Sequence, residues 1–340
     1  MNSAKNKLEK LIFHTAICAG APQIALMAEE KSPSQISLRP VADAPEWRNK
    51  MTNAKKEIAV LLDTEFATGF DVLAPKHPVR SVGVLRPAEA QSESTPPQWR
   101  IAQWACRYNA AEGEVRRQDN GYRYETDSQR VEVTRGGGET VLGLELRASR
   151  EYVSPRQEGG DWPHLLIEQT GLGARCPTLD QLSSLRLTLD ARIPYWACYM
   201  ERPDPAIHTG QTSMFFTVAH VDTQDMYWFG IPIFDARYRQ MREYMAEDGG
   251  KADATHKFIY IVDQASLTDV DLHTGDWMKL DVDILPLIQK GLTVAVDRGF
   301  LKSNAASMYT ITSTNLGWEM PGTYDAALEI KNLSLTAISR

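Results

Sequence analysis

The segment from Leu185 to Ile193 alternates apolar and polar residues more regularly than any other part of the chain. Leucine, alanine and isoleucine occupy every second position, and arginine, threonine and aspartate stand between them. Because successive side chains of a β-strand point to opposite faces of a sheet, this pattern predicts a strand with one buried and one polar face. Such a strand needs a second layer of structure to cover its apolar face.

Shorter runs with the same period follow one another along the chain, with turn residues such as Gly136–Gly138 between them. Few helices interrupt these runs, and no strand–helix–strand rhythm occurs. The sequence therefore predicts a mostly β protein, an antiparallel β-sandwich. The predicted strands cover residues 58–62, 99–104, 122–125, 129–133, 140–146, 161–169, 185–193, 211–220, 228–237, 257–263 and 328–337, the last with a bulge near Asn332.

One or two short helices are expected within this sandwich. The first has Asp283 as its cap and Pro286 in its first turn, carries apolar residues at helical spacing, and ends before Gly299. The second is expected from Tyr238 to Met245.

Three regions of the chain are expected to differ in role. Residues 1–28 begin with a lysine-rich stretch and continue into an apolar-leaning run, so they form either a signal peptide or an N-terminal extension. Residues 29–44 are expected to be a linker, and residues 45–340 a single β-sandwich domain. A signal peptide would make the protein secreted or periplasmic, and an extension would leave it cytoplasmic. No segment approaches the roughly 20 consecutive apolar residues of a membrane span.

Net charge and cysteine usage limit the classes of partner and cofactor. A net charge of −7 argues against a general nucleic-acid binder, because phosphate neutralisation needs clustered lysine and arginine. The four cysteines form no CxxC pair, so no zinc site is expected, and Cys176 and Cys198 could be bridged or free. No cofactor and no metal ligand set is expected, although a structural calcium held by backbone carbonyls would leave no trace in the sequence.

One predicted strand carries a carboxylate among apolar residues. On this strand His164 and Glu168 share one face, and Gln169 lies on the other. A buried, unpaired carboxylate is costly, so Glu168 needs a partner, a metal or a substrate, and burial would raise its pKa as suits a general acid. The alternative is a structural ion pair with an arginine of a neighbouring strand, such as Arg186 or Arg192.

Two further segments place polar residues at strand ends. His208 and Gln211 flank a bend at the start of a strand, where they could contact sugar hydroxyls or a uronate carboxylate, or serve the loop alone. Trp228 is followed by Asp235 and Arg237, which alternate onto one face and could pair with each other or address a ligand.

Trp318 and Glu319 lie between Gly317 and Pro321, in a segment that is expected to form a turn. A tryptophan beside a glutamate offers a stacking surface for a sugar ring next to an acid or base. Trp162 and Trp228 are the other candidate stacking surfaces, with core or rim packing as the alternative. The expected substrate-binding residues are Trp162, His164, Gln169, Gln211, Trp228, Arg237 and Trp318.

Glu168 and Glu319 are the preferred pair of catalytic carboxylates, with Asp235 in reserve. Glycoside hydrolysis uses two such groups, about 5–5.5 Å apart when the enzyme retains the anomeric configuration and about 6.5–9.5 Å apart when it inverts it. The pair therefore predicts that two segments about 150 residues apart meet on one concave face.

Residues 97–338 resemble the concanavalin A-like jelly rolls of carbohydrate-active proteins, secreted glucanases and polysaccharide lyases among them. The resemblance lies in the strand order and in the aromatic, carboxylate and His/Gln residues described above. The Glu-x-Asp-x-x-Glu motif of the glucanases and the Gln-x-His pair of the alginate-lyase type are absent. The resemblance implies a jelly-roll fold and an oligo- or polysaccharide as the partner.

Several functions remain open on this basis. A glycoside hydrolase would use Glu168 and Glu319 as acid and base or nucleophile, and the acidic composition favours it over a lyase. A polysaccharide lyase would use His208 or a tyrosine as base, with Gln211 and an arginine neutralising a uronate. A non-catalytic glycan-binding protein would stack its tryptophans on sugar rings, and a structural β-sandwich would leave its polar strand faces to water.

Overall fold

The structure is a computed structural model that describes residues 56–87, 95–223, 225–249 and 256–340. The expected signal peptide or extension, the expected linker and the first residues of the expected domain lie outside the described residues. Within the described ranges, no helix is both long enough and apolar enough to cross a membrane.

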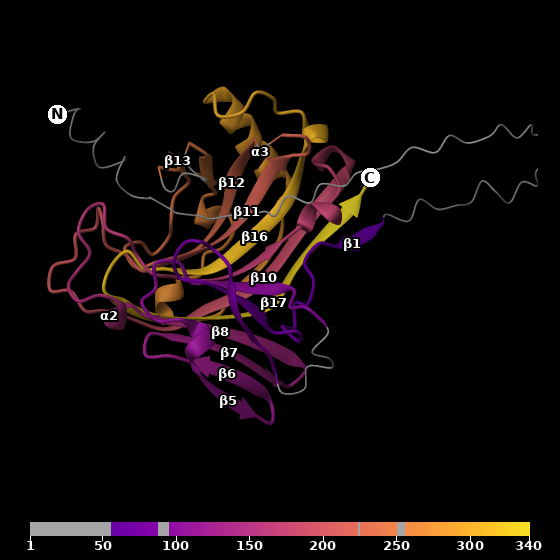
Figure 1. Ribbon diagram of the computed structural model, residues 1–340. Coiled ribbons are helices and arrows are strands. Elements are labelled where there is room, and N and C mark those ends of the chain that lie inside the picture. Colours follow the sequence, from indigo (N-terminus) through magenta and orange to yellow (C-terminus); the bar gives the residue numbers. More distant parts are fainter. Residues whose placement is uncertain (1–55, 88–94, 224, 250–255) are drawn as a thin grey trace, which may run out of the picture.

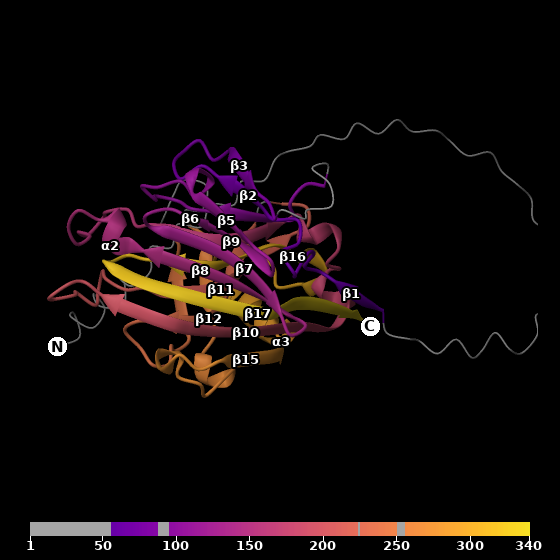
Figure 2. The same ribbon diagram turned by 90° about the horizontal axis from the view of Figure 1, so that it is seen from below.

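Two β-sheets make up most of the molecule (Figure 1). Sheet A consists of β1 (Glu57–Ala59), β5 (Glu114–Gln118), β6 (Gly121–Glu125), β7 (Gln129–Gly136), β8 (Glu139–Arg147), β10 (Leu182–Cys198), β15 (Met278–Asp283) and β17 (Tyr324–Ser339). Its strand order is β15–β10–β17–β8–β7–β6–β5, with β1 paired to β17. Figure 2 shows β8, β17, β10 and β15 following one another across this sheet.

Sheet B has nine strands. They are β2 (Phe70–Leu73), β3 (Ser81–Leu85), β4 (Trp99–Ala102), β9 (His164–Thr170), β11 (Gln211–His220), β12 (Met226–Asp235), β13 (Tyr244–Glu247), β14 (Phe258–Ile261) and β16 (Tyr309–Glu319). The strand order is β13–β14–β12–β11–β16–β9–β4–β2–β3. Pairing is antiparallel except between β12 and β14 and between β2 and β4. The predicted antiparallel β-sandwich is confirmed.

The core lies between the two sheets and is built from one face of each strand. Leu185, Leu187 and Leu189 of β10 are fully buried there, as their alternation predicts, while Arg186 faces solvent. From sheet B, Phe216 of β11 and Phe229 of β12 enter the same core. The opposite, outer face of sheet B carries the polar residues considered below.

Helices are few and short. The predicted helix is confirmed as α3 (Leu285–Asp297), and Gly299 adopts the left-handed conformation after it. Its N-cap is Ile284 and not the expected Asp283, which precedes the cap and whose Oδ1 accepts the N–H of Leu285. The predicted helix from Tyr238 to Met245 is wrong, because Tyr244 opens β13 and pairs with Ile261 at the edge of sheet B. The other helical segments are α2 (Ala148–Glu151) and the 3-10 turns Ala110–Glu112, Leu172–Ala174, Leu179–Gln181, Gln264–Ser266, Leu272–Thr274 and Ala306–Met308.

The cysteines of the described residues are free. Of the two alternatives for Cys176 and Cys198, the unbridged one holds. Cys176 is buried, and Cys198 ends β10 in an exposed position. Cys106 is also buried, and its thiol donates a hydrogen bond of 3.0 Å to the carbonyl oxygen of His164.

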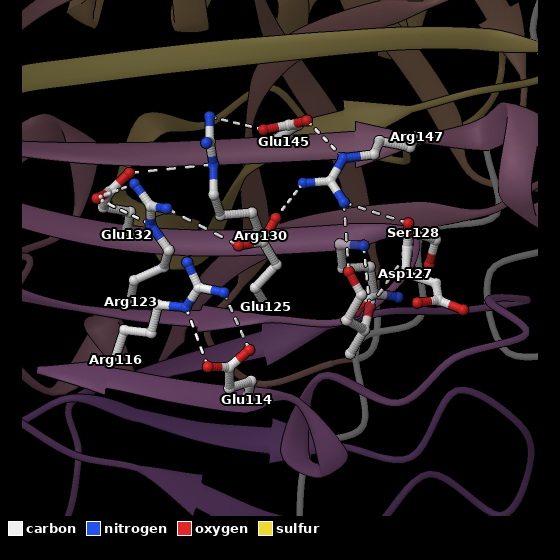
Figure 3. Close-up of polar contacts among 12 residues, drawn as sticks. Glu114, Arg116, Arg123, Glu125, Asp127, Ser128, Arg130, Glu132, Glu145 and Arg147 are labelled. Atoms are coloured by element: carbon white, nitrogen blue, oxygen red, sulfur yellow. Dashed lines mark hydrogen bonds and ion pairs between the residues drawn. The ribbon is translucent and has the colours of Figure 1, made fainter.

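The outer face of sheet A carries a closed ring of ion pairs, which we call the arginine–glutamate ring (Figure 3). Three arginines and three glutamates of β6, β7 and β8 alternate around it, so that each side chain contacts two partners of opposite charge. The contacts are Arg123–Glu132 (2.8 Å), Arg130–Glu132 (4.0 Å), Arg130–Glu145 (2.6 Å), Arg147–Glu145 (2.6 Å), Arg147–Glu125 and Arg123–Glu125 (3.8 Å). The ring balances its own charge and leaves no charged group of its own for a ligand.

Candidate active site

Glu319 is the last residue of β16 and lies on the outer face of sheet B. The predicted turn around Trp318 and Glu319 is wrong: this segment is a strand between β9 and β11, with Glu319 opposite His164 and Gln211. Gly317 makes that pairing possible, because its φ is +149° and a Cβ there would overlap the carbonyl oxygen of Leu165.

The carboxyl group of Glu319 is enclosed by polar and aromatic side chains. Nε2 of Gln211 donates a hydrogen bond of 3.4 Å to its Oε2, and Nε2 of His164 lies 4.0 Å from the same oxygen. Only 5% of Glu319 is exposed, and burial raises the pKa of its carboxyl to about 7. The Asp248 carboxylate acts in the same direction, and the Gln211 amide and Trp162 indole act against it. Near neutral pH this acid can therefore both hold and release a proton.

His164 is held between two aromatic rings. The Trp162 ring stacks on it with centroids 5.8 Å apart, and the Trp104 ring meets it edge-on at 5.6 Å. The Arg156 guanidinium lies 4.7 Å from the Trp162 ring. This column fixes the imidazole next to Glu319. Trp104 was not among the predicted site residues, although the alternation of residues 99–104 could have identified it. Arg156 was not predicted either, and no sequence pattern marks it.

Asp235 stands in the same cross-strand row as Glu319, with Gln211 opposite both of them on the strand between. At about 4.8 Å per strand, the backbones of Asp235 and Glu319 are roughly 10 Å apart. Asp235 Oδ1 accepts hydrogen bonds from Thr209 Oγ1 (2.8 Å) and from Nε and the backbone N–H of Arg237 (2.9 Å each). Oδ2 accepts one further bond, from Nη2 of Arg237 (2.6 Å). Asp235 and Arg237 thus pair with each other.

Glu168 lies on the same outer face but in another row. It stands opposite Asn315, four residues before Glu319, which is roughly 13 Å along the strand. Glu168 forms an ion pair with Arg100 of β4 and is 4% exposed. Burial raises the pKa of its carboxyl and Arg100 opposes that shift. The structure therefore does not bring Glu168 and Glu319 together as a catalytic pair.

Glu168 forms the structural ion pair that was expected as its alternative role, but its partner is Arg100 and not Arg186 or Arg192. Arg186 and Arg192 belong to β10 of sheet A, where they pair with Asp281 and Glu329. The partner of Glu168 instead comes from the neighbouring strand of its own sheet.

Two expected substrate-binding residues have structural roles. Trp318 is fully buried between the sheets, where its Nε1–H donates a bond of 2.9 Å to the carbonyl oxygen of Leu144, so its prediction as a stacking surface is wrong. Side chains alternate along β16, and an outward Glu319 requires an inward Trp318. The side-chain amide of Gln169 bonds both the N–H and the carbonyl of Leu62, which corrects its expected contact with substrate.

The side chains of Trp228 and His208 also make their contacts within the protein. Trp228 lies on the outer face but is 2% exposed, in an apolar cluster with Phe215, Ile259 and Ile261. His208 Nδ1 accepts the backbone N–H of Asp204 at 2.9 Å, and its Nε2 lies 2.7 Å from the carbonyl oxygen of Arg156. Both ring nitrogens of His208 therefore contact backbone groups of the surrounding loops.

No protein-family model matches the sequence, and no curated protein matches it. Among solved structures, the chain is similar to a native family 12 xyloglucanase from Bacillus licheniformis, with a TM-score of 0.38 and 10% identity over 70% of this chain and 99% of that one. It is also similar to the xyloglucanase domain of NopAA, a type three effector from Sinorhizobium fredii (TM-score 0.33, 9% identity, 67% and 97% coverage). A third similar structure is a family 11 xylanase from Neocallimastix patriciarum, with a TM-score of 0.35 and 7% identity over 70% of this chain and 100% of that one.

The described residues contain no group of three or more His, Cys, Asp or Glu side chains that could hold a metal ion. The site around Glu319 consists of a buried carboxylic acid, an amide, an imidazole and an indole, with the Arg237-paired side chain of Asp235 two strands away. These groups supply proton transfer and hydrogen bonding.

Proposed function

We propose that this protein is a polysaccharide-cleaving enzyme, a glycoside hydrolase in which Glu319 is the general acid. The observation that carries the proposal is the buried carboxyl of Glu319, with a pKa of about 7, beside Gln211 and His164. A general acid works best when its pKa lies near the working pH, because it is then protonated often and still releases its proton readily.

In the proposed reaction Glu319 gives its proton to the oxygen of the glycosidic bond as that bond breaks. The hydrogen bond from Gln211 Nε2 then stabilises the carboxylate that remains. Oε1 of Gln211 is buried and has no hydrogen-bond partner among the described residues. A buried acceptor left unpaired destabilises the fold by about 1–3 kcal/mol, so a sugar hydroxyl that donates to Gln211 would recover this.

Asp235 is the proposed second carboxylate, in place of Glu168. It pairs with Arg237, and its Oδ2 accepts one hydrogen bond, which leaves a lone pair for a water molecule. The row spacing of roughly 10 Å between the Asp235 and Glu319 backbones is compatible with the carboxyl separation of about 6.5–9.5 Å in inverting enzymes. Asp235 would act as the base that takes a proton from the attacking water.

Two of the alternatives, the lyase and the glycan-binding protein, receive less support from the contacts. A lyase with His208 as base would need a free ring nitrogen, and both are engaged. A glycan-binding protein would need exposed tryptophans, and of the three expected stacking surfaces only Trp162 is not fully covered. The secreted or periplasmic location expected from the N-terminus remains part of the proposal.

The test is a screen of plant, algal and host polysaccharides that records new reducing ends together with the absorbance of unsaturated uronates. With a cleaved substrate in hand, Glu319→Gln should lower kcat by about 100-fold or more while the protein stays folded. Glu168→Gln is the matched control and should retain most of the activity. Hydrolysis at the wild-type rate by Glu319→Gln would remove this residue from the mechanism, and unsaturated products would favour a lyase.

A further inference from the structure

A pocket of about 640 Å³ opens beside the candidate active site. Asp235 forms part of its wall, and the loop after β12, strands β13 and β14 and the end of α3 supply the rest. Tyr238 and Tyr244 present aromatic surface in it, and Tyr238 is 43% exposed. Because Asp235 belongs to both the candidate active site and this pocket, a chain of sugar units bound across Glu319 could continue into the pocket.

The two carboxylates that line the pocket are neutralised by their neighbours. Asp235 is paired with Arg237. Glu243 accepts a bond of 2.5 Å from Nζ of Lys290 and one of 2.6 Å from the hydroxyl of Tyr260. Neither carboxylate therefore leaves an uncompensated negative charge in the pocket.

Two arginines of the same pocket, Arg242 and Arg298, form no ion pair with any carboxylate of the described residues. Arg298 is the C-cap residue of α3, where the helix dipole favours a cation, and its guanidinium lies 5.8 Å from the Phe258 ring. Arg298 also helps Lys290 to lower the pKa of the Glu243 carboxyl, but it forms no direct ion pair with that group, which is already bonded to Lys290 and Tyr260. The pocket is thus a positively charged region on a chain whose net charge is −7.

We infer that this pocket binds an anionic group of the glycan, the carboxylate of a uronic acid or a sulfate ester, through Arg242 and Arg298. This inference rests on the proposed function and specifies its substrate class, an acidic polysaccharide. A guanidinium presents a rigid fork of N–H donors that matches two oxygens of a carboxylate or sulfate. Tyr238 and Tyr244 would contact the apolar face of the sugar ring that carries the charge.

The test is equilibrium binding to the full-length protein, measured by isothermal titration calorimetry. Three oligosaccharides of equal length are compared: an oligogalacturonate, a sulfated oligosaccharide and a neutral cello-oligosaccharide. We expect at least one acidic oligosaccharide to bind about tenfold more tightly than the neutral one, and this preference to shrink as salt is added. Preference for the uronate identifies a carboxylate site, and preference for the sulfated ligand identifies a sulfate site. Equal or tighter binding of the neutral ligand would overturn the inference.

The double substitution Arg242→Gln and Arg298→Gln should weaken binding of the preferred acidic ligand by about tenfold or more. Arg239→Gln is the matched control, since Arg239 lies on the same loop, is 88% exposed and faces Asp271 at 3.5 Å. It should change the affinity less than about twofold. Unchanged affinity in the double variant would overturn the inference.

Glu319→Gln separates this inference from the proposed function. It should bind the acidic ligand as the wild type does and fail to cleave it. If Glu319→Gln cleaves normally while the arginine variant loses binding, the proposed function fails and the anionic pocket stands. If Glu319→Gln loses cleavage and the arginine variant binds normally, the proposed function stands and the anionic pocket fails.

Discussion

Gln211 on β11 and Glu319 on β16 stand directly opposite each other, and Nε2 of Gln211 donates a hydrogen bond of 3.4 Å to Oε2 of Glu319. This bond favours the ionised form of an acid that burial keeps protonated. The two effects compete at one carboxyl group, and burial is the larger. Gln211 therefore adjusts the pH at which Glu319 releases its proton.

Gln211→Leu removes that hydrogen bond and should raise the pKa of Glu319 further. A general acid is inactive once it is ionised, so activity is lost as the pH rises through its pKa. We expect the alkaline limb of the pH profile of kcat/KM to move up by about one pH unit in the variant. Thr217→Val, towards the other end of β11, is the control and should leave the limb in place. A limb that stays or moves down in Gln211→Leu would contradict the assignment.

Glu319 should also make folding stability depend on pH. Its pKa is about 7 in the folded protein and near 4.5 in the unfolded chain, so the folded state holds the proton more tightly. Below pH 4.5 both states are protonated and the group has no effect. Between pH 4.5 and 7 the unfolded chain ionises first, so stability is lost as the pH rises, by about 3 kcal/mol in total.

Urea unfolding of the wild type and Glu319→Gln at pH 4.5 and pH 8 measures this term. The variant lacks the ionisation, so its free energy of unfolding relative to the wild type should rise by about 3 kcal/mol between the two pH values. Parallel pH dependence of the two proteins would show that Glu319 does not titrate in this range.

The Arg100–Glu168 pair should behave as a structural ion pair. Arg100→Met leaves the buried Glu168 carboxylate without its countercharge, and we expect a loss of about 3 kcal/mol in the free energy of unfolding. Adding Glu168→Leu to Arg100→Met should restore much of that loss, because no buried charge remains. Chemical denaturation of the three proteins checks both expectations, and a double variant less stable than Arg100→Met would refute them.

Gly317→Ala should disrupt the strand that carries Glu319. The new Cβ would overlap the backbone of Leu165 on β9, and the φ of +149° is unfavourable for alanine. We expect a loss of more than about 2 kcal/mol and lower activity, since Glu319 lies two residues away. Gly136→Ala is the control, because a Cβ there meets nothing within 4 Å. Thermal melting compares the two variants, and similar melting temperatures would refute the prediction.

The sequence predicted those parts of the fold that follow from local patterns, and it did not predict those that follow from pairing between distant segments. The alternation in β10 is a local pattern, and it correctly predicted that Leu187 is buried and Arg186 is exposed. β16 has no such pattern, because its residues are buried on both faces from Leu316 to Glu319. Its glycine indicated a turn, and only the pairing with β9 and β11 identifies it as a strand.

The candidate site was predicted in its residue types and not in its pairings. Glu319, Gln211, His164 and Trp162 were each identified separately, and the structure brings them together. The partner of Glu168 could not be inferred, because choosing between Arg100 and an arginine of sheet A requires the strand order. Strand order depends on contacts between segments far apart in the sequence, which neither periodicity nor composition records.

The arginine–glutamate ring on sheet A bears on how this sequence can change over evolutionary time. Each of its six members touches two partners of opposite charge, so a single charge reversal at any position creates two like-charge contacts at once. Substitutions at the ring positions are therefore expected to remove charges or to replace several members together. We expect related sequences to keep or lose these six charges together, a linkage that would mark β6, β7 and β8 as one evolutionary unit.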